Sequence, residues 1–350
     1  MNGEQILSAD NMFRTWVVDV KSLLRTGENN LRIYFHAVFK INVPKWENAE
    51  FRLDAPANND QSDVQISMYS RKAGYHYGWD WGPRLVTAGV WRPVLIRSWD
   101  AGRIAGVQVF QADVSPEKAD LDVHARLNIT KRQVYQVEAF INGKEAAKSI
   151  MYLDAGKQTE KLPIQIKNPK LWWTHDLGDQ PLYDIKVKLL DSHTVLDEQT
   201  VRIGVRSIEF VREPDEYGKS FFFKLNGKPV YIKGANYIPQ DNFQNRVTPE
   251  RYESLMTDAV KANMNMLRVW AAAFTKKTSF MSFAMKKDCW CGRISCLPAP
   301  CIPATKLFLK MCGMKCWIMS GACAIMPVSP CGAATMRIRS AGKAGAGRRI

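Results

Sequence analysis

The chain has 350 residues, with 49 basic and 34 acidic side chains, a formal net charge of +15 and 46% hydrophobic residues. Residues 1–270 hold 36 basic and 33 acidic residues, a balance typical of globular proteins, and the sequence shows no signal peptide, transmembrane run or low-complexity linker. Residues 271–350 hold 13 basic residues and one acidic residue, and therefore supply +12 of the formal net charge of +15. They also hold all eight cysteines and half of the fourteen methionines.

Residues 1–270 contain short segments in which apolar and polar side chains alternate, the pattern of half-buried β-strands. These segments are Leu31–Phe35, Val107–Phe110, Leu121–Ala125 and Tyr183–Val187. Turn signals separate such segments, among them the pairs Asn142-Gly143 and Asn226-Gly227, and Asn-Gly is the favoured hairpin dipeptide. Between residues 103 and 205 the short strands are numerous enough to predict a β-sandwich of immunoglobulin-like size.

After residue 228 the pattern changes to strand, helix, strand. Residues Pro229–Gly234 are predicted to form a buried strand, and Asn263–Trp270 to form the next one. Between them, Thr248 and Pro249 predict the start of a helix, with Thr as the N-cap and Pro at the first helical position. This βαβ unit is the repeat from which parallel sheets and (β/α)8 barrels are built.

Three explanations compete for the basic tail of residues 271–350. A zinc domain would use Cys289, Cys291, Cys296, Cys301, Cys312, Cys316, Cys323 and Cys331, but their spacings of 2, 5, 5, 11, 4, 7 and 8 do not repeat as zinc knuckles do, and the tail has no His. A disulfide scaffold requires an oxidising compartment, to which no N-terminal signal directs the chain. The third explanation is a tail translated in a shifted reading frame.

The motifs in residues 1–270 resemble those of one family. The segment Arg71–Arg84, read as RKAGYHYGWDWGPR, resembles a signature of the β-mannosidases of glycoside hydrolase family 2, and its Trp-Asp-Trp-Gly-Pro block is specific to that branch. Further matching segments are Gly89–Val94, Leu171–Trp173, Gln180–Tyr183, Gly204–Arg206, Gly234–Pro239 and Asn265–Trp270. The resemblance runs continuously over residues 1–270.

The resemblance implies a multidomain, mainly β fold. Residues 1–100 would form a partial jelly-roll β-sandwich, residues 101–206 an immunoglobulin-like β-sandwich, and residues 207–270 the first strands of a (β/α)8 catalytic barrel. Residues 271–350 would be a frame-shifted tail without a native fold. Because the chain opens inside the jelly roll, about half of that domain is expected to be missing, which would expose sheet edges.

The resemblance also makes the frame shift testable. In this family Arg-Val-Trp is followed by Gly-Gly-Gly-Ile-Tyr-Glu, where this chain has Ala-Ala-Ala-Phe-Thr-Lys at residues 271–276. Removing one G from TGG GGC GGC GGC ATT TAC GAA produces the observed residues. The shifted frame is read by joining the third base of each codon to the first two bases of the next. In this frame Met285/Lys286 and Met314/Lys315 must encode Glu, Trp290/Cys291 must encode Val, and Trp317/Ile318 must encode Asp. All four are compatible with one acidic barrel sequence. The sequence therefore predicts a frame shift after Trp270.

This frame shift would remove the catalytic residues. Retaining glycosidases use two carboxylates about 5–5.5 Å apart, one as acid/base and one as nucleophile. The resemblance places the acid/base Glu in an Asn-Asn-Glu motif at the end of barrel strand 4, where its codon straddles Met336 and Arg337, and the nucleophile on strand 7, beyond residue 350. The parent would hydrolyse terminal β-D-mannosyl residues with retention and without a cofactor or metal, whereas this chain is expected to be inactive.

Five residues are expected at the edge of the mannose pocket. The resemblance places Trp79 and Asp80 on a jelly-roll loop that reaches over the barrel mouth and contacts the sugar. It places Asn236, Arg268 and Trp270 at the ends of strands 1 and 2, on the face where barrel active sites lie. Arg268 fits a barrel salt bridge equally well. Other aromatic residues, Trp81, Trp91, Trp172 and Trp173, are expected in cores or interfaces, and Tyr237 stands where the family commonly has Trp.

The expected partner of the parent is a β-mannoside oligosaccharide or glycan. A nucleic-acid partner is not expected, because the positive charge comes from the tail and no RNA- or DNA-binding motif accompanies it. A membrane partner is not expected either. Two other classes remain open: a non-catalytic carbohydrate-binding β-sandwich module, and a zinc- or nucleic-acid-binding Cys-rich tail.

Overall fold

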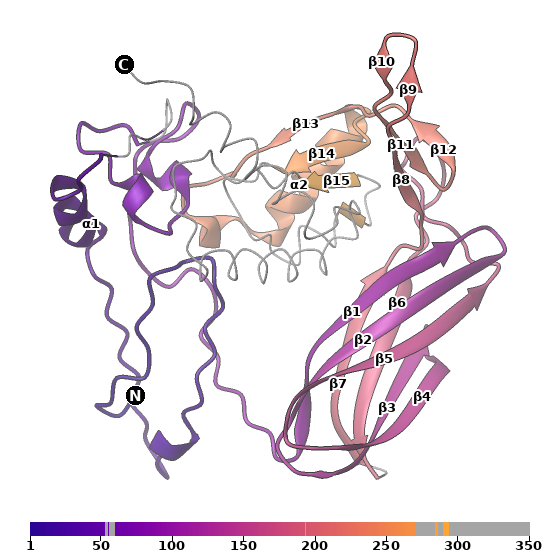
Figure 1. The fold of residues 1–350 in the computed structure, drawn as a ribbon, viewed down its shortest axis with the longest axis horizontal. Coiled ribbons are helices and arrows are strands. Elements are labelled where there is room, and N and C mark those ends of the chain that lie inside the picture. Colours follow the sequence, from indigo (N-terminus) through magenta and orange to yellow (C-terminus); the bar gives the residue numbers. More distant parts are fainter. Residues whose placement is uncertain (53–54, 56–59, 193, 270–283, 286–289, 294–350) are drawn as a thin grey trace.

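The computed structural model describes residues 1–52, 55, 60–192, 194–269, 284–285 and 290–293 (Figure 1). The α-helices are α1 (Val38–Glu47) and α2 (Pro249–Lys261), and the 3-10 turns are Lys21–Leu23, Ser67–Tyr69, Gly74–Tyr77 and Gln244–Arg246. The strands are β1 (Gly102–Val114), β2 (Lys118–Ile129), β3 (Gln133–Ile141), β4 (Lys144–Leu153), β5 (Gly156–Lys167), β6 (Tyr183–Asp191), β7 (Thr194–Ile203), β8 (Ile208–Val211), β9 (Pro214–Asp215), β10 (Gly218–Lys219), β11 (Phe222–Leu225), β12 (Lys228–Val230), β13 (Gly234–Tyr237), β14 (Met266–Val269) and β15 (Trp290–Arg293). No helix in these ranges is long and apolar enough to cross a membrane.

Strands β1–β7 form an antiparallel sandwich of two sheets, ordered β1-β2-β5 and β4-β3-β6-β7 (Figure 1). The predicted strands at residues 107–110, 121–125 and 183–187 lie within β1, β2 and β6, so these predictions are confirmed. Side chains of β2 alternate between buried and half-buried positions along its whole length. Its buried side chains, with those of β3 and β6, form the core between the two sheets.

Both predicted Asn-Gly hairpins are present. Asn142 and Gly143 connect β3 to β4 with φ angles of 48° and 84°, and Asn226 and Gly227 connect β11 to β12 with φ angles of 50° and 79°. Positive φ at both central positions is the requirement of a type I′ turn, which Asn and Gly meet at low cost. The two loops therefore fix the register of their strands.

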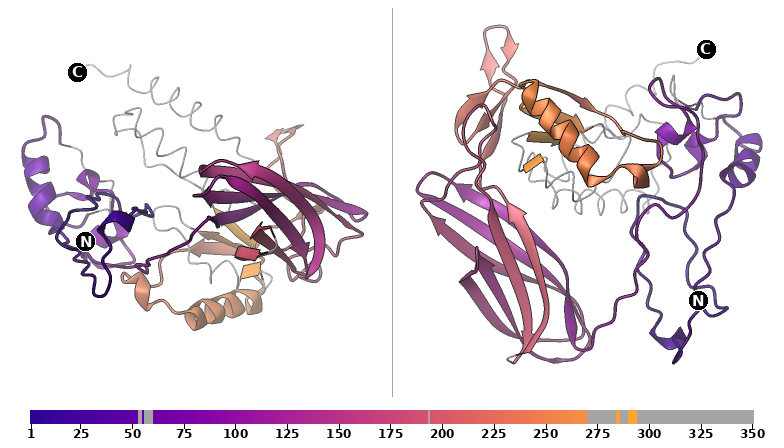
Figure 2. Two further views of the ribbon diagram at one scale, coloured as in Figure 1. Left: turned by 90° about the horizontal axis from the view of Figure 1, so that it is seen from below. Right: turned by 180° about the vertical axis from the view of Figure 1, so that it is seen from behind.

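The part of the chain before β1 differs from the prediction. No β-strand forms in its described residues, and its only bridges outside named strands are Asn11 with Arg71 and Trp79 with Gly82. Figures 1 and 2 show long extended stretches there without arrows. The strand predicted at Leu31–Phe35 is wrong: the segment is extended but unpaired, and Tyr34 is 74% exposed. Alternation predicts an extended segment, but a strand also needs a neighbour for its backbone hydrogen bonds.

The chain leaves the sandwich through a small sheet ordered β12-β11-β8, and β9 pairs with β10 beside it. The prediction of one buried strand over Pro229–Gly234 is wrong. Strand β12 ends at Val230 because it pairs with β11 only across the short Asn226-Gly227 hairpin, and Tyr231 is 84% exposed. The next strand, β13, begins at Gly234, where a Cβ atom would lie 1.8 Å from the carbonyl oxygen of Met266. Only glycine therefore fits at this close approach of two strands.

The predicted βαβ unit is present as β13, α2 and β14. The two strands are parallel, with Gly234 opposite Met266 and Tyr237 opposite Val269. Helix α2 begins as predicted, with Pro249 in its first turn and the Thr248 hydroxyl accepting a hydrogen bond from the Arg251 amide at 3.4 Å. Buried side chains of α2 pack against β14: Tyr252, Met256 and Ala259 lie in one cluster with Leu267 and Val269.

A third parallel strand lies within the tail. Strand β15 pairs with β14, with Met266 opposite Trp290 and Val269 opposite Arg293. The prediction that residues 271–350 have no native fold is therefore wrong for these four residues. Strand pairing uses backbone groups, which every residue except proline carries in full. Most other residues of the tail, including the remaining cysteines and the Met336/Arg337 boundary, lie outside the described residues.

A charged contact joins the segment after Trp173 to the start of the βαβ unit. The Asp176 carboxylate lies 3.0 Å from the Lys233 Nζ and accepts a hydrogen bond of 3.0 Å from the Asn265 Nδ2. Asn265 is 1% exposed, and its Oδ1 accepts a hydrogen bond from the Lys233 amide at 2.9 Å. Burial alone would raise the pKa of Asp176, but the side chains of Thr174, Lys233 and Asn265 together lower it to about 2.

We expect Asp176→Asn to remove a pH-dependent part of the stability. Because the folded-state pKa lies below the usual value of 3.8, the contribution is present above about pH 5 and is lost as the pH falls through 4 towards 2. Its size is about 1 kcal/mol after allowance for solvent screening of a side chain that is 22% exposed. Urea midpoints at pH 7 and pH 3 measure it. Asp179→Asn, in the same loop, is the control, and equal effects of the two substitutions would contradict the assignment.

Candidate functional site

The signature segment ends in a tight turn. The Trp79 amide donates to the Gly82 carbonyl at 3.0 Å, and the Gly82 amide donates to the Trp79 carbonyl at 3.2 Å. Asp80 and Trp81 therefore stand at the tip, where Asp80 is exposed and Trp81 is half-buried with its ring 5.8 Å from that of Tyr75. Asp80 has no hydrogen bond or ion pair within the described part of the chain. The turn thus presents a carboxylate beside indole rings.

A buried layer supports this turn. Tyr75 and Tyr77 have no exposed surface, and burial, followed by the charge of Lys72, lowers the pKa of His76 to about 4. His76 is therefore neutral at pH 7. Beneath them the Asp60 carboxylate, with no exposed surface, pairs with the Arg84 guanidinium at 2.9 Å. A buried ion pair with good geometry is a specific anchor for the segment that precedes and follows the turn.

Two predicted site residues lie at the carboxyl ends of adjacent parallel strands. Asn236 in β13 is opposite Arg268 in β14, and the Arg268 Nη1 donates a hydrogen bond of 2.8 Å to the Asn236 Oδ1. Within the described residues Arg268 makes no ion pair, so the salt-bridge alternative has no support there. Tyr237 follows Asn236, and its hydroxyl accepts a hydrogen bond from the Gln240 Nε2 at 3.3 Å. Trp270, the fifth predicted site residue, lies outside the described residues.

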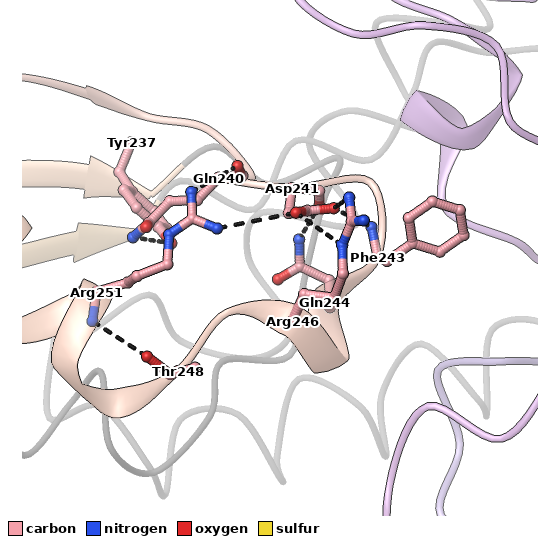
Figure 3. A network of polar contacts seen from close by, with 8 residues as sticks. All are labelled: Tyr237, Gln240, Asp241, Phe243, Gln244, Arg246, Thr248 and Arg251. Atoms are coloured by element: carbon pink, nitrogen blue, oxygen red, sulfur yellow. Dashed lines mark hydrogen bonds and ion pairs between the residues drawn. The ribbon is translucent and has the colours of Figure 1, made fainter.

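The loop from β13 to α2 is held by a single carboxylate (Figure 3). Asp241 accepts hydrogen bonds from the Phe243 amide at 2.7 Å and from the Arg246 guanidinium at 2.8 and 3.1 Å, and Arg251 lies 3.8 Å away. Burial would raise the pKa of Asp241, but the hydrogen bonds from Arg246 and Phe243 and the positive charges of Arg246 and Arg251 lower it overall. The loop therefore has a defined shape at neutral pH.

This loop also contacts the signature turn. The Asn242 Nδ2 donates a hydrogen bond of 2.8 Å to the Pro83 carbonyl, across 159 residues of sequence. The structure thus connects Trp79 and Asp80, through the turn and this loop, to the strand end that carries Asn236. Four of the five predicted site residues lie on these connected elements. The carboxyl ends of parallel strands in barrel-type folds are where active sites lie.

Sequence reasoning missed Asn242 and Gln61. The Gln61 Nε2 donates to the Trp79 carbonyl at 3.0 Å, so it supports the turn from the other side. Neither residue belongs to a motif that distinguishes it from other surface amides. Within the described ranges no group of three or more His, Cys, Asp or Glu side chains is arranged to hold a metal ion.

Two family models match the chain. Residues 1–92 match the glycosyl hydrolase 2 galactose-binding domain-like model, and residues 103–206 match the glycosyl hydrolases family 2 model. Among curated proteins, β-mannosidase B of Aspergillus clavatus is 31% identical over 285 residues, which cover 80% of this chain and 33% of that protein. β-Mannosidase B of Thermothelomyces thermophilus is 33% identical over 284 residues, covering 80% and 32%. The chain therefore spans about one third of the length of the curated relatives it matches.

A solved structure shares both the fold and part of the sequence. The β-D-mannosidase from Dictyoglomus thermophilum superposes with a TM-score of 0.83 and 30% identity, covering 93% of this chain and 40% of that protein. β-Glucuronidase 2 of Bacteroides uniformis has a TM-score of 0.53 and 17% identity, covering 64% and 28% of the two chains. The second likeness shows the fold alone.

Proposed function

Since this chain belongs to glycoside hydrolase family 2, we propose that it is part of a retaining β-mannosidase acting on terminal β-D-mannosyl residues of a glycan. The observation that carries the proposal is the contact between the signature turn and the loop after β13. This contact supports a pocket in which Trp79 and Asp80 act together with Asn236 and Arg268. A sugar has apolar ring faces and polar hydroxyl edges, which suit this mixture of groups.

We assign the parts of the chain as follows. Residues 1–100 are a partial jelly-roll domain, residues 101–206 an immunoglobulin-like sandwich, residues 207–270 the start of a catalytic barrel, and residues 271–350 a frame-shifted tail. The parallel pairing of β13 with β14 on either side of α2 supports the barrel assignment, because this strand, helix, strand unit is the repeat of such barrels.

The 350-residue chain itself is proposed to be catalytically dead. Retention requires two carboxylates, and the tail after Trp270 contains a single acidic residue, Asp288. The ends of β13 and β14 carry Asn236, Tyr237, Arg268 and Val269, none of which is a carboxylate. Sequencing the DNA across the Trp270/Ala271 codons tests the cause. If the DNA contains one more G than this sequence implies, the shift is a sequencing error. If the number of G residues is unchanged, the shift is in the gene.

Asp80→Asn is expected to reduce kcat/KM for a β-mannoside by about 10- to 100-fold in the frame-restored protein. The substitution removes one charged hydrogen-bond acceptor and changes little else, and hydrogen bonds to charged groups contribute about 1.5–3 kcal/mol. Steady-state kinetics measure the effect. Asp63→Asn, at another exposed position of the same domain, is the control. An equal kcat/KM for the Asp80→Asn variant and the frame-restored protein would show that Asp80 does not bind the substrate.

A second candidate is sugar binding without hydrolysis. It is favoured by the match of residues 1–92 to a galactose-binding domain-like model. Titrating the 350-residue chain with mannose and with galactose, while following tryptophan fluorescence, tests it. A saturable response that Trp79→Phe abolishes would support this module. The absence of any fluorescence response would rule out sugar binding by the 350-residue chain, and sugar recognition would then require the complete barrel.

A further inference from the structure

We propose that Asn242 is a positioning residue, which fixes the turn of residues 79–83 against the carboxyl ends of β13 and β14. The relevance of this position to sugar binding rests on the proposed function, but the position of the turn itself does not depend on it. Asn242 would act through the turn and touch no substrate, so it belongs to neither the predicted pocket residues nor the missing catalytic pair.

The contact between Asn242 and Pro83 is buried and has good geometry. Asn242 is 8% exposed, and its Nδ2 donates to the Pro83 carbonyl at 2.8 Å, a normal hydrogen-bond length. A buried amide that lost this acceptor would leave a donor unsatisfied, which is costly. The bond therefore favours one position of the turn relative to the loop.

Hydrogen bonds around Asp241 hold the loop between β13 and α2 in one conformation. Asp241, the neighbour of Asn242, accepts hydrogen bonds from the Phe243 amide and the Arg246 guanidinium (Figure 3). The Gln244 side chain donates to the Asp241 carbonyl. These bonds fix the backbone on both sides of Asn242. Because the backbone of the loop is fixed relative to β13, the Asn242 side chain can hold the turn in a fixed position relative to β13.

Two side-chain amides bind the turn, one at each end. Gln61 donates to the Trp79 carbonyl at the start of the turn, and Asn242 donates to the Pro83 carbonyl after its end. Gly82 lies so close to Asn242 that an added Cβ would be 3.3 Å from its Oδ1. Gln61 belongs to the same part of the chain as the turn. Asn242 reaches the turn from the loop between β13 and α2, so it links the position of Asp80 to the strand that carries Asn236.

Amide hydrogen exchange of the 350-residue chain tests this inference without any sugar. In Asn242→Ala the Trp79 and Gly82 amides are expected to exchange about tenfold faster, as loss of one buried hydrogen bond predicts. Amides of β2, in the sandwich, are expected to keep their rates. Asn242→Asp is nearly the same size but cannot donate when ionised, so it should match the alanine variant at pH 7. Unchanged turn amides in both variants would overturn the proposal.

A spectroscopic measurement separates positioning from a general loss of structure. In protein labelled with 5-fluorotryptophan, the Trp79 signal, assigned through Trp79→Phe, is expected to shift or broaden in Asn242→Asp at pH 7. It should return towards the wild-type signal near pH 4, because the protonated carboxyl can again donate to Pro83. A signal that does not respond to pH in this variant would count against a donor role.

Gly82→Ala disturbs the same contact from the turn, and it decides the question if the Asn242 variants unfold. Its methyl group should push Asn242 away and accelerate exchange of the turn amides, again with β2 unchanged. Wild-type rates in this variant would overturn the proposal. The result is independent of sugar binding. If these exchange effects were seen but the frame-restored protein did not hydrolyse mannosides, the proposed function would be refuted and the positioning role would stand.

Discussion

Adding one G to the codons at the Trp270/Ala271 junction is expected to raise β-mannoside hydrolysis by at least about 10⁶-fold over the 350-residue chain, the lower end of enzymatic rate enhancements. The added base would restore Gly-Gly-Gly after Trp270 and the acid/base Glu at the Met336/Arg337 boundary. With the natural downstream DNA, it would also bring the strand 7 nucleophile into frame. Release of p-nitrophenol from p-nitrophenyl β-D-mannoside measures the effect on purified proteins of confirmed mass.

Two matched controls isolate the reading frame from the insertion itself. Adding three G residues at the same junction inserts one glycine and leaves the tail out of frame, so it should give no activity. Replacing the restored acid/base Glu by Gln in the in-frame protein should also remove most of the rate, because the leaving group loses its proton donor. Mannoside turnover by the pure 350-residue chain would contradict the proposed loss of both carboxylates.

The sandwich was predictable because its signals are local. Alternation with a period of two, as at residues 121–125 and 183–187, fixes which face of a strand is buried. The Asn-Gly pairs at 142–143 and 226–227 specify hairpins by their backbone preferences alone. The same holds for α2, where Thr248 and Pro249 mark the start without knowledge of any partner.

The features that the sequence did not predict depend on residues far away in the chain. Leu31–Phe35 alternates as well as the confirmed strands do, but no described strand lies beside it. Val230 ends β12 because the length of a hairpin is set by its partner β11, and a hydrophobic run does not show that limit. Asn242 is one amide among many, and its acceptor at Pro83 is 159 residues away. Of the predicted site, the signature and strand ends were visible in sequence, whereas the contact that joins them was not.

Trp172 connects three parts of the described chain through one side chain. It is 2% exposed and lies in a buried cluster with Leu225 and Val230. Its indole Nε1 donates to the Met285 carbonyl at 3.0 Å, and the Arg206 guanidinium lies 4.9 Å from the ring centroid. The prediction of a core or interface aromatic at this position is confirmed.

Trp172→Ala is expected to destabilise this junction by about 3–5 kcal/mol, the usual cost of deleting a buried aromatic side chain. That is a large fraction of the 5–15 kcal/mol typical of a domain, so the small sheet of β8, β11 and β12 should exchange its amides hundreds-fold faster. Amides of β2 should change little, because the sandwich has its own core. Trp173→Ala is the matched control: its ring is only half-buried, and the expected cost is about 1 kcal/mol. Equal losses in the two variants would contradict the prediction, because neither the deeper burial of Trp172 nor its junction contacts would then distinguish it from Trp173.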